Sequence, residues 1–240
     1  MRLAIDTATD LASVAAGTPG RAHPPAARSV RGARRHAAQL LPLIQQVLAD
    51  AGAGLDDITE IVVGDGPGSF TGLRIGWAAA RGIAHERGLP LVAIPSLLGA
   101  AHAASEVERD GRPVAACYDA LRGQVFGAVY VVHPGRVETL VAPALLTLGE
   151  LARLTSARPG LAVGDGAERY RAEVEAWTGR PPLPLDAVPA IAARLLLLAD
   201  QGEARRPLGD ALAEPAYGRP AEAQAKWEAR HGRALPNSSR

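Results

Sequence analysis

Cysteine, lysine and long apolar runs are almost absent from this chain of 240 residues. Cys117 is the only cysteine, so no intrachain disulfide can form, and this composition is typical of a reducing compartment. Lys226 is the only lysine, so nearly all positive charge comes from arginine. No apolar run approaches the ~20 residues of a membrane-spanning helix, and Asp6 comes too early for a signal peptide. We therefore expect a soluble, cytoplasmic protein that has no membrane partner.

The residues that are present predict a globular α/β protein. Hydrophobic residues make up 48% of the chain, which is enough for one large domain or two small lobes. The formal net charge is +1, so bulk charge does not indicate a nucleic-acid binder. Strands are predicted at 3–5, 12–16, 60–64, 91–94, 114–118, 124–132, 137–141 and 161–164, and helices at 36–51, 69–87, 96–107, 148–154, from 168 onward and at 187–201.

Two local patterns occur once in each half of the chain. A strand that ends in an acid and returns through a short turn occurs at Asp6 and again at Asp119. A strand that ends in Gly-Asp-Gly before a helix occurs at 64–66 and again at 164–166. Their order is the same in both halves, which favours a duplication over coincidence. We expect an N-terminal lobe at residues 1–112, a C-terminal lobe at residues 113–220 and a flexible tail at residues 221–240.

The segment from Gly64 to Gly76 has the layout of a phosphate-binding loop. An apolar strand leads into a glycine-rich turn, and the turn opens a helix whose first N–H groups favour an anion. The loop lacks the lysine of the Walker pattern, and Ser69 stands where a dinucleotide loop has glycine. The alternative is a tight turn into a closely packed helix. For the anion hypothesis, the candidate contacts are Asp6, Thr7, Gly66, Gly68 and Ser69.

The same helix carries small residues at every fourth position. Gly72, Gly76, Ala80 and Ala84 form one smooth stripe, which lets another backbone approach closely. Each glycine weakens a helix by about 0.5–1 kcal/mol relative to alanine, so close packing is a reasonable compensation. The spacing alone leaves open whether the stripe packs inside the domain or against a partner.

Acidic residues and one histidine are weaker candidates for chemistry. Asp6, Asp65, Asp119 and Asp165 all end strands, where four carboxylates could hold Mg²⁺, but aspartate more often caps turns. We favour the turn role for Asp165 and leave Asp6 open. His36 has no second histidine one helical turn away, so no metal site is assigned. The sequence contains no nucleophile elbow or zinc-protease motif, and no catalytic residue is assigned.

A local basic patch precedes the first predicted helix. No acid occurs from Leu11 to Ala49, whereas five arginines fall between Arg21 and Arg35. This patch could contact RNA or an acidic partner, or it could be a solvated loop. It contains no aromatic residue, so base stacking is not expected there.

Several short segments together resemble a known family. They are Leu3 to Thr9, His36 with 40–44, Gly66 to Gly76, Asp119-Ala120 with Arg122-Gly123, Val163 to Gly166, and Pro215-Ala216-Tyr217. Their order and spacing over about residues 1–220 resemble the bacterial TsaB (YeaZ) family. The block from Gly66 to Gly76 is the most specific part. Ala8 departs from the family pattern, which usually has serine there.

The resemblance implies the two-lobed actin, sugar kinase and Hsp70 (ASKHA) fold, with a duplicated mixed sheet in each lobe. It also implies a noncatalytic subunit that helps form N6-threonylcarbamoyladenosine at position 37 of tRNA. The implied partners are a catalytic TsaD-like subunit, a TsaE-like ATPase, tRNA through the complex, and a second copy of the chain when it is alone. No cofactor is firmly implied beyond weak ATP or ADP binding at the complex.

The resemblance further implies that partners dock on the helices at 36–51 and 69–87. The expected interface residues are His36, Leu40, Leu41, Ile44, Ser69, Phe70, Gly72, Leu73, Gly76 and Ala80, some of which must face the core. The resemblance thereby favours packing of the small-residue stripe against a partner rather than inside the domain. It also predicts that Gly76→Leu abolishes pairing while the fold stays intact. The alternative function is an ATP-dependent phosphotransferase of the same superfamily.

Overall fold

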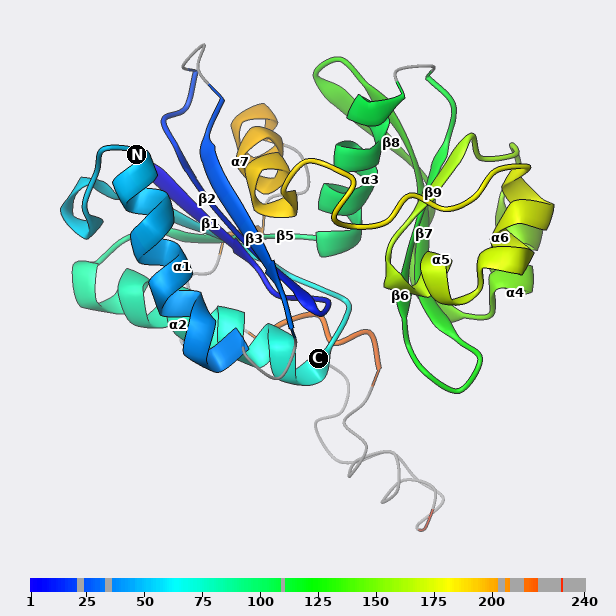
Figure 1. Cartoon of the computed structure of the whole chain (residues 1–240), viewed down its shortest axis with the longest axis horizontal. Helices are drawn as coiled ribbons and strands as arrows, with labels where there is room; N and C mark the ends of the chain where they lie inside the picture. The colour runs from blue at the N-terminus through cyan, green and yellow to red at the C-terminus, as the bar shows by residue number, and fades with distance from the viewer. Residues whose placement is uncertain are drawn as a thin grey trace.

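A computed structural model describes residues 1–20, 24–32, 36–108, 111–202, 206–207, 214–219 and 230. Over these residues it forms two β-sheets with helices between them and on both outer faces (Figure 1). The first sheet has the order β10-β5-β4-β1-β2-β3, and the second has the order β8-β7-β6-β9. The strands are β1 Arg2–Asp6, β2 Leu11–Gly17, β3 Ala26–Arg31, β4 Glu60–Gly64, β5 Leu91–Ile94, β6 Val114–Asp119, β7 Val125–His133, β8 Arg136–Leu146, β9 Leu161–Val163 and β10 Arg206–Pro207.

The two sheets repeat one topology. In the first, β1 pairs antiparallel with β2 and parallel with β4; in the second, β6 pairs antiparallel with β7 and parallel with β9. The outer strands β3 and β8 continue each sheet in the same way. Leu183 even forms a parallel bridge to Val163, in the position that β5 takes beside β4. The duplication predicted from the repeated motifs is therefore confirmed.

The helices lie in three groups (Figure 1). They are α1 His36–Asp50, a 3₁₀ turn η2 at Leu55–Asp57, α2 Phe70–Arg87, α3 Ser96–Val107, α4 Leu148–Leu154, α5 Asp165–Arg169, α6 Arg171–Thr178 and α7 Ile191–Gln201. The outer face of the first sheet packs on α1 and α2, through side chains such as Leu3 and Ile5. The outer face of the second sheet packs on α4 and α6, where Cys117 is buried.

The middle layer exchanges a helix between the two halves. The helix α3, from the N-terminal half, contacts β6, β7 and β9, whereas α7, from the C-terminal half, contacts β1, β2 and β4. The two helices also pack on each other, where an added Cβ at Gly99 would lie under 3.0 Å from Leu195. One apolar cluster therefore extends from Ala4 and Val62 in one sheet to Tyr118 in the other. A boundary near residue 112 stays a prediction.

Most predicted elements agree with the structure to within a few residues. The main correction lies after β9, where the helix predicted from Glu168 is two short helices, the first beginning at Asp165. The strand predicted at 137–141 is longer, and the strand at 206–207 was not predicted. The proposed tail at 221–240 lies outside the described residues, except for Arg230. Within the described part, every helix is too short or too polar to cross a membrane.

Candidate functional site

The glycine-rich turn after β4 is closed against the turn between β1 and β2. The Ser69 N–H donates a 2.7 Å hydrogen bond to the Ala8 carbonyl. An added Cβ at Gly68 would lie under 3.0 Å from that same carbonyl, and one at Gly72 would meet the carbonyl of Thr7. Ser69 also caps α2, because its hydroxyl accepts a hydrogen bond from the Gly72 N–H. The glycines therefore allow close packing within the chain.

The small-residue stripe faces inward. Gly72, Gly76, Ala80 and Ala84 are all buried, and an added Cβ at Gly76 would lie under 3.0 Å from the Thr7 hydroxyl. This burial corrects the partner interpretation of the stripe. It also corrects the expectation that Gly76→Leu leaves the fold intact, because the larger side chain would displace Thr7.

Burial divides the other expected interface residues. Leu40 and Ile44 are buried in the apolar cluster between the first sheet and the helices α1 and α2. Leu73 is buried in the cluster that extends between the two sheets, so none of the three lies on the surface. Leu41 is 57% exposed and Phe70 is 41% exposed. Ser69 is half-buried, and the side chain of His36 lies outside the described residues. Of the expected residues, Leu41 and Phe70 therefore remain available to a partner, together with other exposed positions of the same two helices.

The exposed face of α1 is uncharged, and small residues form part of the exposed face of α2. From Ala37 to Ala49, α1 carries no charged residue, although half of this stretch faces solvent. On α2, Thr71, Ala78 and Gly82 are exposed, and an added Cβ at Gly82 would meet nothing within 4 Å. These exposed positions are also small: Ala78 and Gly82 lie two residues before Ala80 and Ala84 of the buried stripe, and Thr71 lies one residue before Gly72. The sequence carries this signal, but only burial shows which stripe is outside.

A short segment, residues 214–219, crosses the glycine loop and joins both lobes (Figure 1). The Ala216 N–H donates to the Asp65 carbonyl at 2.8 Å. The Tyr217 ring lies 4.8 Å from the Phe70 ring, and its hydroxyl accepts a 3.2 Å hydrogen bond from Arg74. Arg219 donates to the Ala120 carbonyl in the second lobe. We call residues 214–219 the crossing segment.

The expected anion contacts Asp6 and Thr7 are buried and already hydrogen-bonded. The Asp6 carboxylate accepts hydrogen bonds from the Ser96 hydroxyl and the Ala8 N–H. The Thr7 hydroxyl donates to the Gly72 carbonyl at 2.7 Å. Gly66 lies beneath the Ala216 carbonyl, because an added Cβ there would come within 3.0 Å of it. The anion hypothesis therefore requires this region to open.

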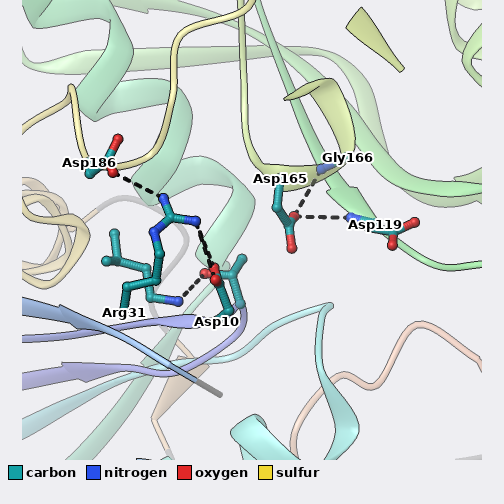
Figure 2. Close-up of polar contacts among 8 residues, drawn as sticks. Asp10, Arg31, Asp119, Asp165, Gly166 and Asp186 are labelled. Atoms are coloured by element: carbon teal, nitrogen blue, oxygen red, sulfur yellow. Dashed lines mark hydrogen bonds and ion pairs between the residues drawn. The ribbon is translucent and has the colours of Figure 1, made fainter. Parts of the chain in front are cut away.

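Charged side chains from both lobes face a pocket of about 430 Å³ (Figure 2). Arg31, at the end of β3, contacts Asp10 of its own lobe and Asp186 of the other lobe, each at 3.2 Å. Asp119 and Asp165 lie across the pocket from them. Sequence reasoning missed Asp10, Arg31 and Asp186 as a group. No local signal could have found it, because Asp186 comes from a loop far along the chain.

The Asp165 carboxyl, which lines this pocket, has a shifted pKa. Burial raises its pKa to about 6, and hydrogen bonds donated by the Asp119 and Gly166 N–H groups oppose that shift. These two bonds support the turn role that the sequence favours. The four strand-end acids do not line one pocket, because Asp6 and Asp65 are buried and are not among the residues that line this one. Within the described residues, no cluster of three or more metal-ligating side chains could hold an ion.

The basic patch is partly neutralised. Arg28 forms a bidentate ion pair with Asp50 of α1, and Arg31 is paired as described above. Arg21, Arg34 and Arg35 lie outside the described residues. A tRNA contact by this patch stays a prediction.

Sequence comparisons identify relatives over most of the chain. Residues 30–178 match the family model described as TsaD, tRNA N6-adenosine threonylcarbamoyltransferase. The tRNA threonylcarbamoyladenosine biosynthesis protein TsaB of Bacillus subtilis is 30% identical over 206 residues, which cover 81% of this chain and 84% of that protein. TsaB of Escherichia coli is 35% identical over 150 residues, or 60% of this chain and 63% of that protein. TsaB of Haemophilus influenzae is 38% identical over 125 residues, so this chain spans only 51% of its length.

A solved structure agrees with these relatives. YeaZ from Pseudomonas aeruginosa is 29% identical and superposes with a TM-score of 0.69, over 90% of this chain and 99% of that one. The duplicated mixed sheets and the exchanged helices thus form a two-lobed α/β fold that this chain shares with YeaZ. From the extent of both similarities, the chain belongs to the TsaB (YeaZ) family.

Proposed function

We propose that this protein is a noncatalytic subunit that binds and activates a TsaD-like catalytic subunit. The complex would form N6-threonylcarbamoyladenosine at position 37 of tRNA, with a TsaE-like ATPase as a further partner. Relatives named for this biosynthesis and the match to the transferase family support the proposal. In the absence of TsaD, the same surface would pair two copies of this chain.

The observation that carries the proposal is the uncharged outer face of α1, which is accompanied by small exposed residues on α2. A helix surface that stays in water normally carries charged residues, whereas the centre of an interface is depleted of them. Between Ala37 and Ala49 the exposed positions are alanine, leucine, proline and glutamine. Small exposed residues at Ala78 and Gly82 would let a partner helix approach α2 closely. A stable pairing there would bury roughly 1,600 Å² in total.

The closed glycine loop favours a binding role over the phosphotransferase alternative. A phosphate loop presents free N–H groups to the anion, whereas here the Ser69 N–H is bonded to Ala8 and the crossing segment covers Gly66. The buried Asp6 carboxylate is likewise bonded to Ser96. Weak ATP or ADP binding would then belong to the complex. Calorimetric titration of the isolated chain with ATP and Mg²⁺ should give no heat of binding, and micromolar affinity with turnover would revive the alternative.

The interface is tested by a charge in the uncharged face. Leu41→Asp would bury a carboxylate in the interface, and we expect pairing with the cognate TsaD-like subunit to weaken at least tenfold. The matched control is Leu154→Asp, because Leu154 is similarly exposed but lies on α4 of the other lobe. Both variants should keep the parental circular dichroism. Co-elution and isothermal calorimetry measure the pairing, and mass spectrometry of tRNA nucleosides measures the modification. Unchanged co-elution of Leu41→Asp would contradict the interface assignment.

A further inference from the structure

The crossing segment and the first turns of α2 together form an exposed surface beside the face proposed for pairing. Phe70 and Arg74 come from α2, and Tyr217 and Arg219 come from the crossing segment. Phe70, Arg74 and Arg219 are exposed, and Tyr217 is half-buried. We call these four residues the arginine–aromatic surface. It is distinct from the basic patch before α1, whose described arginines are paired with carboxylates.

The two arginines of this surface are held in place by their neighbours. The Arg74 guanidinium lies 4.2 Å from the centroid of the Phe70 ring, and its Nε–H donates to the Tyr217 hydroxyl at 3.2 Å. The Phe70 and Tyr217 ring centroids are 4.8 Å apart. One terminal nitrogen of Arg219 donates to the Ala120 carbonyl at 3.0 Å. Because these contacts order the side chains before a ligand arrives, binding would cost less conformational entropy.

Both arginines keep donors that no carboxylate uses. Among the described residues, neither Arg74 nor Arg219 forms an ion pair, whereas elsewhere Arg28, Arg31 and Arg171 are each paired with an acid. A guanidinium has five N–H donors, and the hydrogen bonds given above occupy one nitrogen of each side chain. The remaining N–H groups are therefore able to donate to an oxyanion, which is the usual partner of arginine.

The segments around this surface contain few acids. No aspartate or glutamate occurs at residues 66–85 or at residues 120–137. The crossing segment has one acid, Glu214 at its first position, and this side chain already has an interaction partner. Asp119, which precedes the turn after β6, is paired with Arg169. The charge next to the two arginines is therefore positive, and it complements a polyanion.

Among polyanions, an RNA chain fits this surface better than an acidic peptide does. Arg74 is stacked on an aromatic ring, and a stacked guanidinium directs its N–H edge to a phosphate while its plane supports a base. Arg219 follows Tyr217 by two residues, so a chain of phosphates that meets Arg74 passes close to Arg219 as well. An acidic peptide has carboxylates for the arginines but no phosphate chain and no bases.

We propose that the arginine–aromatic surface binds tRNA directly, with Arg74 and Arg219 on backbone phosphates and the Phe70–Tyr217 pair as their support. The choice of tRNA among RNAs rests on the proposed function. Phosphate contacts fix the position of a nucleic acid and carry no sequence information, so this surface would orient the substrate rather than select it. Because the surface lies beside the face proposed for pairing, the subunit would hold the tRNA next to the catalytic subunit.

The test measures binding of fluorescently labelled tRNA to the isolated full chain by anisotropy, over a series of potassium chloride concentrations. Near physiological salt we expect a dissociation constant of about 10 μM. Arg74→Gln and Arg219→Gln should each weaken binding about fivefold. Each should also reduce the slope of the logarithm of affinity against the logarithm of salt by about one, because one phosphate contact is lost. The matched control is Arg153→Gln, an exposed arginine on α4, which should bind as the parent does.

Lysine variants separate a binding role from a structural one. Arg74→Lys and Arg219→Lys keep the positive charge, so both should restore the parental salt slope, although the planar guanidinium is lost. Circular dichroism should be the same for all variants. Unchanged affinity and slope in both glutamine variants overturn the proposal. A slope that lysine does not restore also overturns it, because the arginines would then only hold the crossing segment.

A competitor and the choice of the isolated chain complete the test. Displacement of the tRNA by polyglutamate, at the same concentration of negative charge, overturns RNA as the ligand in favour of an acidic protein. Because the assay uses the chain alone, its result does not depend on a TsaD-like subunit. A failure of pairing would leave the tRNA result standing, and a failure of tRNA binding would leave the pairing test with Leu41→Asp standing.

Discussion

The two Gly-Asp-Gly turns occupy the same place in the two lobes but differ in what covers them. The turn at 64–66 is closed by the crossing segment, and Asp65 is only 8% exposed. The turn at 164–166 lines the open pocket between the lobes, where burial raises the pKa of Asp165 to about 6. Both turns pack tightly on the end of the adjacent central strand, since an added Cβ at Gly64 or Gly166 would meet β1 or β6.

The repeated motif therefore determines the topology of each lobe, whereas the residues around it determine the environment of its aspartate. The glycines permit the close approach of strand and turn in both lobes. Whether the aspartate of each motif reaches solvent depends on the crossing segment, which is distant in the chain and covers only the turn at 64–66. The four predictions below alter each side of this comparison in turn, from the largest expected effect to the smallest.

Gly72→Ala should disrupt the packing of α2 against the turn after β1, and we expect it to cause the largest loss of stability. An added Cβ would meet the Thr7 backbone carbonyl, which cannot rotate away, so we expect a destabilisation of about 2–3 kcal/mol. The control on the same helix is Gly82→Ala, which has open space and should be neutral or stabilising by up to about 1 kcal/mol. Urea unfolding measures both. Equal effects at the two glycines would contradict the tight packing of the loop.

Asp165→Asn should remove the free-energy cost of ionising a buried carboxyl in the turn at 164–166. The folded-state pKa, about 6, lies above the ordinary aspartate value of 3.8, so the folded state holds an extra proton between these two pH values. Stability from this group is therefore fully present at lower pH and is lost as pH rises through about 6. The variant should be more stable than the parent by about 1–2 kcal/mol at neutral pH, with the gain vanishing near pH 4.

The measurement for Asp165→Asn is the unfolding free energy as a function of pH. Asparagine can still accept the hydrogen bonds from the Asp119 and Gly166 N–H groups, so the turn should remain. Asp56→Asn is the control, because the Asp56 side chain is 99% exposed. A gain that does not depend on pH would show that ionisation is not the cause.

Ala216→Pro should uncover the closed turn. Proline removes the N–H that donates to the Asp65 carbonyl, with an expected loss of about 1 kcal/mol. Ala216→Ser keeps this N–H and is the matched control. Limited proteolysis should cut the crossing segment faster in the proline variant only. Equal cleavage in both variants would indicate that the bond does not hold the segment.

Arg31→Gln should have the smallest effect, although it breaks the contact between the lobes. Arg31 and Asp186 are 43% and 62% exposed, so the pair contributes about 0–1 kcal/mol and is screened by salt. Arg28→Gln provides the comparison, because it breaks a similarly exposed pair within one lobe. Thermal unfolding at low and high salt measures both. A loss above about 2 kcal/mol for Arg31→Gln would show that the ion pair, rather than the exchanged helices, joins the lobes.

Local patterns predicted most of the secondary structure. Ser69 and Gly88 mark the two ends of α2 correctly, because a hydroxyl cap and a left-handed glycine are local requirements. The helix after β9 was placed too late, because the sequence gives no clear start signal between Gly164 and Glu168. The strand β10 has only two residues and depends on pairing with β5, so no local pattern could indicate it.

The candidate surfaces were only partly predictable. The sequence identified the helices α1 and α2, but it pointed to Gly72 and Gly76, which pack inward on Thr7. The outer stripe at Thr71, Ala78 and Gly82 has nearly the same composition, so spacing could not separate the two faces.

The sequence by itself determined the fold of this protein. Its strands, its turns and the order of its repeated motifs follow from side-chain periodicity and glycine conformation, which act over a few residues. Only the tertiary structure decided which surfaces are open. It placed α3 and α7 on each other's sheets, closed the first Gly-Asp-Gly turn and left the second in a pocket. Burial and charge depend on residues that are distant in the chain, and these contacts decide which groups can bind a partner or a ligand.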